Sequence, residues 1–287
     1  MKIVTDCAAD IPAEELQKFG IASAPLMIHF PEGEVSSDDI SADDFYNRLE
    51  AMRPLIPTTA QPSSGMFAEM YRKVADTGRQ ILSVHISSGL SGTINSAHLG
   101  GEQAADVADV TTWDTLTLSG GERFQVLAAA LAASAGWTMQ AIQERLSAIR
   151  DETEVIYTLE TLEYLARGGR IGRVQALMGS VLKIKPLIRV DHTDGKYTTV
   201  AKERTASQAM MAITNHLYTM YQNTPVWVTV LHGRLQKSAE DLSHQLEDKL
   251  NVAKLEILRI SPVLGVHTGP GIVGAAVVPI HLMEGIE

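Results

Sequence analysis

Short apolar runs alternate along the chain with longer segments in which hydrophobic residues recur at helical spacing. The run at residues 81–86 is interrupted only by Ser83 and His85, which is typical of a buried strand. A loop rich in serine and glycine follows at residues 87–93, and a helical pattern begins near Ile94. This order of strand, loop and helix predicts an α/β fold.

The same two patterns predict the other elements of the chain. Helices are expected at 13–19, 41–52, 66–75, 119–136, 138–151, 161–166, 206–221 and 238–250. Strands are expected at 2–5, 24–30, 107–113, 154–159, 184–190, 197–201, 226–231 and 254–260. The alternation predicts a mostly parallel sheet with helices on its faces, and such sheets bind ligands at the carboxyl ends of their strands.

The serine-rich loop at residues 87–93 follows a predicted strand, so it lies at that end of the sheet. Its hydroxyls are hydrogen-bond donors, its glycines allow a ligand close to the backbone, and the helix start adds free N–H groups. These features favour a site for a small anionic head group. The alternative is an ordinary helix cap by Ser91 or Thr93. A second hydroxyl-bearing loop, at residues 57–65, also precedes a helical segment.

Two later segments combine glycine with residues that bind ligands. Residues 167–173 contain three arginines and three glycines, which indicates either a flexible cationic hinge or a solvated surface turn. The helical pattern then continues to Lys183. In residues 261–271, His267 lies among small residues and glycines, so its ring is able to face a cavity; a structural histidine is the alternative.

Composition narrows the classes of function. The 287 residues are long enough for two domains, and the net charge of −10 argues against nucleic acid and against an anionic membrane surface as partners. The single cysteine, Cys7, excludes a disulfide framework, and the nine histidines show no metal-ligand spacing, so we expect neither a metal nor a cofactor. We find no signal peptide and no transmembrane run, and therefore expect a cytoplasmic protein.

Six motifs, in this order along nearly the whole chain, resemble those of the DegV family of bacterial fatty-acid-binding proteins. They are residues 5–10, 59–63, 87–93, 162–172, 184–186 and 267–271. The resemblance implies a two-domain fold, with an N-terminal α/β domain at residues 1–153 and a second α/β domain with a mixed sheet at residues 154–287. It also implies that a long-chain fatty acid is buried between the two domains.

The resemblance further implies a role beside a kinase. In members that serve fatty-acid kinase, a separate kinase component phosphorylates the bound carboxylate to an acyl phosphate, and the binding protein is not the catalyst. The residues matching the head-group site are Thr59, Ser91 with Gly92, His267 with Thr268, and Arg170. Arg204 matches a position that helps to dock the kinase.

The acyl tail needs an apolar slot. Candidates by their place in apolar strands and helices are Leu26, Ile28, Leu90, Met178, Leu182 and Ile188. We expect neutral donors at the head group, because a carboxylate that awaits phosphorylation has to stay nucleophilic.

Two positions depart from the family pattern: Cys7 and Ala60 each stand where the family usually has serine.

Two other functions stay open on the sequence. The first is a hydrolase or acyltransferase with Ser91 as nucleophile, His267 as base and Asp6 or Asp10 as the orienting acid, although Ser91 is not in a Gly-x-Ser-x-Gly elbow. The second is a kinase subunit of the dihydroxyacetone-kinase type, in which a histidine bonds covalently to a ketone.

Overall fold

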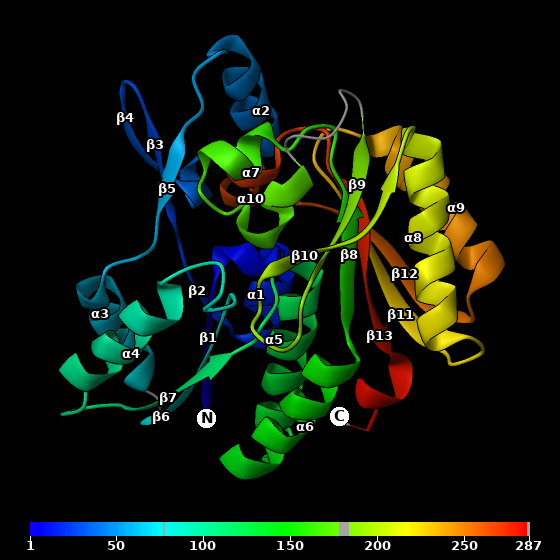
Figure 1. Cartoon of the computed structure of the whole chain (residues 1–287). Coiled ribbons are helices and arrows are strands. Elements are labelled where there is room, and N and C mark those ends of the chain that lie inside the picture. Colours follow the sequence, from blue (N-terminus) through cyan, green and yellow to red (C-terminus); the bar gives the residue numbers. More distant parts are fainter. Residues whose placement is uncertain (77, 178–183, 286–287) are drawn as a thin grey trace.

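The computed structural model describes residues 1–76, 78–177 and 184–285. The N-terminal part contains a parallel four-stranded sheet in the order β2 (Ala22–Ala24), β1 (Lys2–Asp6), β6 (Gln80–His85) and β7 (Asp109–Asp114). Successive residues of β6 face opposite sides: Ile81 packs with α3 (Ser64–Ala75) and α4 (Thr93–Gln103), and Leu82 packs toward α5 (Ser119–Ser134). The expected parallel sheet with flanking helices is therefore confirmed (Figure 1).

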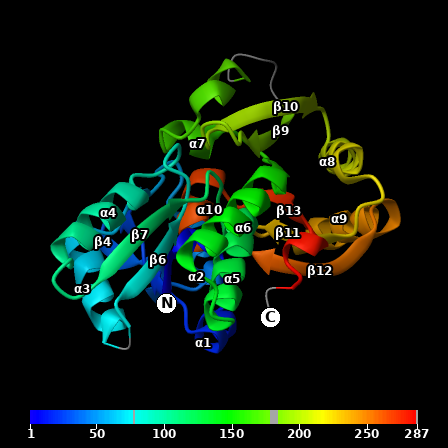
Figure 2. The same ribbon diagram turned by 90° about the horizontal axis from the view of Figure 1, so that it is seen from below.

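The C-terminal part contains a six-stranded mixed sheet. Its order is β10 (Tyr197–Glu203), β9 (Lys185–Val190), β8 (Glu154–Thr158), β13 (Val273–Pro279), β11 (Val226–His232) and β12 (Val252–Arg259). The last two strands pair parallel and the other neighbours pair antiparallel. Helices α8 (Ala206–Tyr221) and α9 (Gln236–Lys249) cover the outer face, while α5 and α6 (Met139–Glu152) lie on the inner side (Figure 2).

A third, antiparallel sheet was not predicted. It consists of β4 (Gly33–Ser36), β3 (Met27–Phe30) and β5 (Thr58–Ala60), and it packs with α2 (Ala42–Ala51). The prediction of one strand at 24–30 is wrong, because β2 and β3 belong to different sheets. Pro25 between them has no N–H to donate, and the N–H of Leu26 donates to the Sγ atom of Cys7.

The segment after β12, for which no helix was predicted, contains helix α10 at Pro262–Thr268. Proline at the first helical turn suits a helix start. Helix α7 (Glu163–Arg167) lies beside α10 (Figure 1), and a 3-10 helix follows at Gly172–Leu177. The end of the predicted helix to Lys183 lies outside the described residues. The short helix α1 (Ala13–Phe19) matches its prediction and ends at Gly20 in the left-handed conformation.

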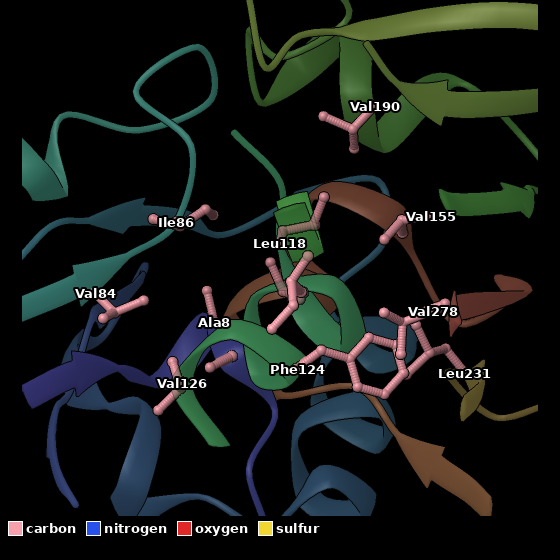
Figure 3. Packing of buried hydrophobic residues seen from close by; sticks show 14 of the residues in the cluster. Ala8, Val84, Ile86, Leu118, Phe124, Val126, Val155, Val190, Leu231 and Val278 are labelled. Carbon is pink, nitrogen blue, oxygen red and sulfur yellow. The ribbon is translucent and has the colours of Figure 1, made fainter. Parts of the chain in front are cut away.

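One hydrophobic core joins the two large sheets. It contains Leu82, Phe124, Val155 and Trp227, and Figure 3 shows Leu118, Phe124 and Val155 in its interior. Arg123 of α5 is fully buried at its edge. Its guanidinium donates to Glu15 of α1 at 2.7 and 3.0 Å and pairs on its other side with Glu256 of β12. Arg123 therefore ties the N-terminal part to the mixed sheet, while the domain boundary after residue 153 stays a prediction.

We expect Arg123→Met to lower the free energy of unfolding by about 3 kcal/mol, because it leaves two partly buried carboxylates without their cation. Urea unfolding measures the change. The matched control is Arg72→Met, whose exposed pair with Asp106 contributes less than about 1 kcal/mol. Equal losses in the two variants would contradict the role of Arg123.

Candidate functional site

The serine-rich loop packs tightly against the hairpin between β9 and β10. The Ser87 hydroxyl donates to the carbonyl oxygen of Gly195 at 2.8 Å. A Cβ atom on Gly195 would lie 1.8 Å from the Ser87 oxygen, and one on Gly89 would lie 2.4 Å from the Asp194 carbonyl oxygen. Both positions therefore require glycine, and the hairpin covers the loop.

Ser91 lies just before α4, whose cap residue is Gly92 and has no side-chain cap bond. The Ser91 hydroxyl lies 2.8 Å from the Thr93 hydroxyl and accepts the Thr93 N–H at 3.3 Å. Gly92 contacts the amide of Gln61, from the second hydroxyl-bearing loop. The two loops that the sequence singled out thus meet at the start of α4.

Thr59 and His267, which are 208 positions apart, meet directly. Thr59 lies in β5 opposite Ile28, and its Oγ1 atom is 2.8 Å from Nε2 of His267 on α10. The other ring nitrogen, Nδ1, is buried without a hydrogen-bond partner and lies where a Cβ atom on Gly168 would stand. The glycine of the cationic segment therefore leaves the space that the imidazole occupies.

Both residues line a small cavity of about 30 Å³ at the junction of the two parts. Its polar wall also contains Ser91 and Arg170, so the structure brings together four of the head-group residues named from the sequence, and two of the tail candidates, Leu26 and Leu90, line the same cavity. Its apolar wall comes from Ala8, Leu26, Ile86, Leu90, Tyr197, Val263 and Leu264. Val263 and Leu264 were missed because no helix was predicted in their segment, and only the helix places them on the same element as His267.

Burial, with a smaller contribution from nearby Arg170, lowers the pKa of His267 from 6.5 to about 4. The imidazole is therefore neutral near neutral pH, in agreement with the expected neutral head-group donors. Arg170 is held by two carbonyl groups, donating from its NH1 atom to Gly168 at 2.7 Å and from Nε to Leu90 at 3.4 Å. The site consequently presents hydroxyls, an uncharged imidazole and one restrained cation.

A second cavity of about 20 Å³ shares Leu264 with the first as a lining residue. Leu264 and Thr268 stand one helical turn apart on α10 and both line it. The Thr268 hydroxyl donates back to the Leu264 carbonyl at 3.0 Å, so it is already satisfied. The remaining lining is mostly apolar and comes from the mixed sheet, the segments next to its strands and the start of α5: Leu118, Ser119, Val155, Tyr157, Leu231, Ile260 and Ile272.

The other residues named from the sequence lie in different surroundings. Ile28 is buried beside Phe45, and Ile188 is buried in the core between the large sheets; neither lines the two cavities. Arg204 is exposed just after β10. Met178 and Leu182 lie outside the described residues.

The geometry does not assemble the alternative catalytic triad. Asp6 accepts a hydrogen bond from Nδ1 of the buried His85 at 2.9 Å. The other ring nitrogen of His85, Nε2, lies 2.7 Å from the hydroxyl of the buried Ser83. Asp10 accepts the Ser119 hydroxyl at 2.5 Å and the Ser261 N–H at 2.7 Å. Neither carboxylate orients His267, which pairs with Thr59 and not with Ser91.

The described residues contain neither a metal-binding cluster nor a membrane-spanning helix. Within the ranges 1–76, 78–177 and 184–285, no group of three or more histidine, cysteine or acidic residues is arranged to hold a metal. In the same ranges, no helix combines the length and the apolar character that crossing a membrane requires.

Comparison with known proteins assigns the fold to one family. The model of the DegV family, described as uncharacterised proteins, matches residues 1–279. A DegV domain-containing protein of Deinococcus radiodurans is 36% identical over 280 residues, covering 96% of this chain and 95% of its own. The chain belongs to the DegV family, so the resemblance seen in the sequence is confirmed.

Solved structures agree with this assignment. A fatty-acid-binding DegV family protein from Thermus thermophilus is similar with a TM-score of 0.90 and 27% identity, over 97% of this chain and 99% of that one. A stearic-acid-binding protein from Eubacterium ventriosum gives a TM-score of 0.87 and 25% identity, over 97% and 98% of the two chains. The two-sheet α/β architecture is thus shared with DegV structures.

The lowered pKa of His267 predicts a pH dependence of stability. Between pH 6.5 and about 4 the unfolded chain binds a proton at this residue and the folded chain does not, so stability falls as the pH falls through this window. The total effect is about 3 kcal/mol. We expect the difference in unfolding free energy between the parent and His267→Gln to change by this amount across the window, as measured by urea unfolding.

The comparison with the parent is needed because burial raises the pKa of Asp10 to about 6. Protonation of Asp10 makes stability rise as the pH falls, which opposes the effect of His267. Since Asp10 is present in both proteins, its contribution cancels in the difference. His98→Gln, at an exposed histidine, is the matched control and should show a nearly constant difference. The same constant difference for His267→Gln would contradict a neutral buried imidazole.

Proposed function

We propose that this protein binds one long-chain fatty acid at the junction of its two domains, residues 1–153 and 154–287, with the carboxylate in the cavity of Thr59, Ser91 and His267. The observation that carries this proposal is the pairing of Thr59 with His267 at 2.8 Å beside Ser91 and Arg170. The fatty-acid-binding proteins of the same fold support the ligand class.

Burying a carboxylate costs several kcal/mol unless donors meet it. The hydroxyls of Thr59 and Ser91 and one N–H of the neutral His267 are the donors available here. In this proposal the hydroxyls exchange their present partners for the carboxylate oxygens. Arg170 lies at the same cavity, and two of its five N–H groups donate to carbonyl oxygens, which restrains the position of its guanidinium.

The tail passes from the head-group cavity beside Leu264 into the second cavity. Burial of each methylene contributes about 0.8 kcal/mol, so the tail supplies most of the affinity. The two cavities hold only about 30 and 20 Å³, whereas sites for ligands of drug size hold roughly 300–1,000 Å³. Side chains along the junction, Leu264 first among them, therefore repack when the ligand binds.

We further propose that the protein presents the bound carboxylate to a separate kinase component in the cytoplasm, which converts it to an acyl phosphate. The neutral surroundings of the head group keep the carboxylate nucleophilic. Arg204, exposed beyond the edge strand β10, is the proposed docking contact for the kinase. In this scheme the protein is a carrier and the kinase is the catalyst.

Denaturing extraction followed by lipid mass spectrometry, with native mass spectrometry of the intact protein, tests the ligand. We expect close to one fatty acid per chain. A protein that carries none and takes up neither palmitate nor oleate would overturn the proposal.

Thr59→Val and Ser91→Ala test the head-group site. Each removes one donor to a carboxylate, which is worth about 1.5–3 kcal/mol, so we expect roughly a tenfold or larger loss of affinity in a fluorescent fatty-acid displacement assay. Thr219→Val, at an exposed hydroxyl on α8, is the matched control. Unchanged affinity in both site variants would exclude this position for the carboxylate.

A further inference from the structure

The segment that follows β1 carries two acids for which the proposed function has no task. Asp6 ends β1, and Asp10 stands four residues later, at the end of the 3-10 helix Cys7–Ala9. This short helix packs against α5 and against α10, the helix of His267. Ala8, in its middle, lines the head-group cavity. Both acids therefore lie on a segment that adjoins the site.

Asp6 connects the end of β1 to the serine-rich loop. Within the described residues, its buried carboxylate has three hydrogen-bond donors, and all of them are N–H groups. One oxygen accepts the N–H of Ala8 at 3.0 Å. The other accepts the N–H of Ile86 at 3.1 Å and Nδ1–H of His85 at 2.9 Å. Ala8 and Ile86 both line the head-group cavity, and Ile86 directly precedes the loop that carries Ser91.

Asp10 connects the same segment to α5 and α10. One carboxylate oxygen accepts the hydroxyl of Ser119, the first residue of α5, at 2.5 Å, and the other accepts the N–H of Ser261, just before α10, at 2.7 Å. Asp10 and Ser119 both have a left-handed backbone, with φ of 51° and 52°. This conformation is uncommon outside glycine and persists where the surrounding contacts hold it. Because α10 has seven residues, about two turns, a shift of its start also moves His267.

We infer that Asp6 and Asp10 are positioning residues for the head-group site. Asp6 fixes the strand end before the loop of Ser91, and Asp10 fixes the start of the helix of His267. Neither acid touches the bound carboxylate; each acts through a backbone N–H of an element that carries a head-group donor. A binding site keeps its geometry only when such contacts hold its donors in place. This inference rests on the proposed function and adds to it the residues that shape the site from behind.

Replacement of Asp10 separates this role from a general loss of stability. Asp10→Gly removes both bonds and keeps the left-handed backbone accessible, so we expect about a tenfold loss of affinity for hexadecanoic acid in the displacement assay. Asp10→Asn should restore most of this loss, because its oxygen accepts the Ser261 N–H and its NH₂ group donates to the Ser119 hydroxyl. Thr138→Ala, which removes the side-chain cap of α6, is the control for lost stability alone and should bind as the parent does.

The same substitution should act differently at Asp6. Its two oxygens accept different backbone N–H groups, those of Ala8 and Ile86. Whichever way an asparagine turns there, its NH₂ group faces one of these donors and leaves it without an acceptor. We therefore expect Asp6→Asn to weaken binding about tenfold, in contrast to Asp10→Asn. Equal affinities of the two asparagine variants would contradict the assigned geometry.

Amide hydrogen exchange, followed by NMR, tests the two bonds without any variant. In the parent, the N–H groups of Ile86 and Ser261 should exchange slowly, because each donates to a carboxylate. Rapid exchange at either position would overturn the inference even where the variants do not fold. In folded Asp10→Gly, the amides of residues 264–269 should exchange about tenfold faster than in the parent, while those of α6 keep their rates.

The outcomes separate this inference from the proposed function. Parent-like affinity in a folded Asp10→Gly variant would overturn the positioning role of Asp10 and leave the proposed function intact. A parent protein that binds no fatty acid would overturn both. A tenfold loss in Asp10→Gly that Asp10→Asn does not restore would also count against the inference, because the asparagine keeps both contacts.

Discussion

The fixed relation between the two large sheets is the constraint on which the site depends. Arg123 is fully buried with carboxylates from α1 and β12 on its two sides, and an apolar core continues past it. A buried guanidinium is tolerated only where its charge and donors are matched, so moving these elements apart would leave Arg123 buried without its partners. Thr59 and His267 come from opposite sides of this junction, and their contact follows from it.

Most of the polar groups at the site are uncharged. His267 is neutral, Ser91 and Thr59 are uncharged donors, and the nearby Arg170 is occupied by carbonyl oxygens. The strongly paired acids, Asp6 with His85 and Asp10 with Ser119, belong to other networks. This separation fits a protein that holds a carboxylate intact more closely than it fits a hydrolase, which needs an acid behind its histidine.

Local patterns were sufficient for most helices and strands, since α1, α8 and β11 lie close to their expected positions. They failed where tertiary contacts decide the structure. Pro25 splits an apolar run between two sheets, β5 is too short to show a period, and α10 is built from residues typical of a loop. Family resemblance named Thr59, Ser91 and His267, but the cavity walls at Val263 and Leu264 depend on packing that no local pattern contains.

The contact between Ser87 and Gly195 bears on the rates at which a ligand enters and leaves the protein. The hairpin meets the head-group loop so closely that neither glycine has space for a methyl group. For a carrier of the proposed kind, a need for these two surfaces to part would raise the barriers to entry and to exit together, which slows both rates without changing the affinity. Residence time and affinity are then separately adjustable, so such a protein can deliver its cargo one molecule per encounter instead of equilibrating continuously with the free pool.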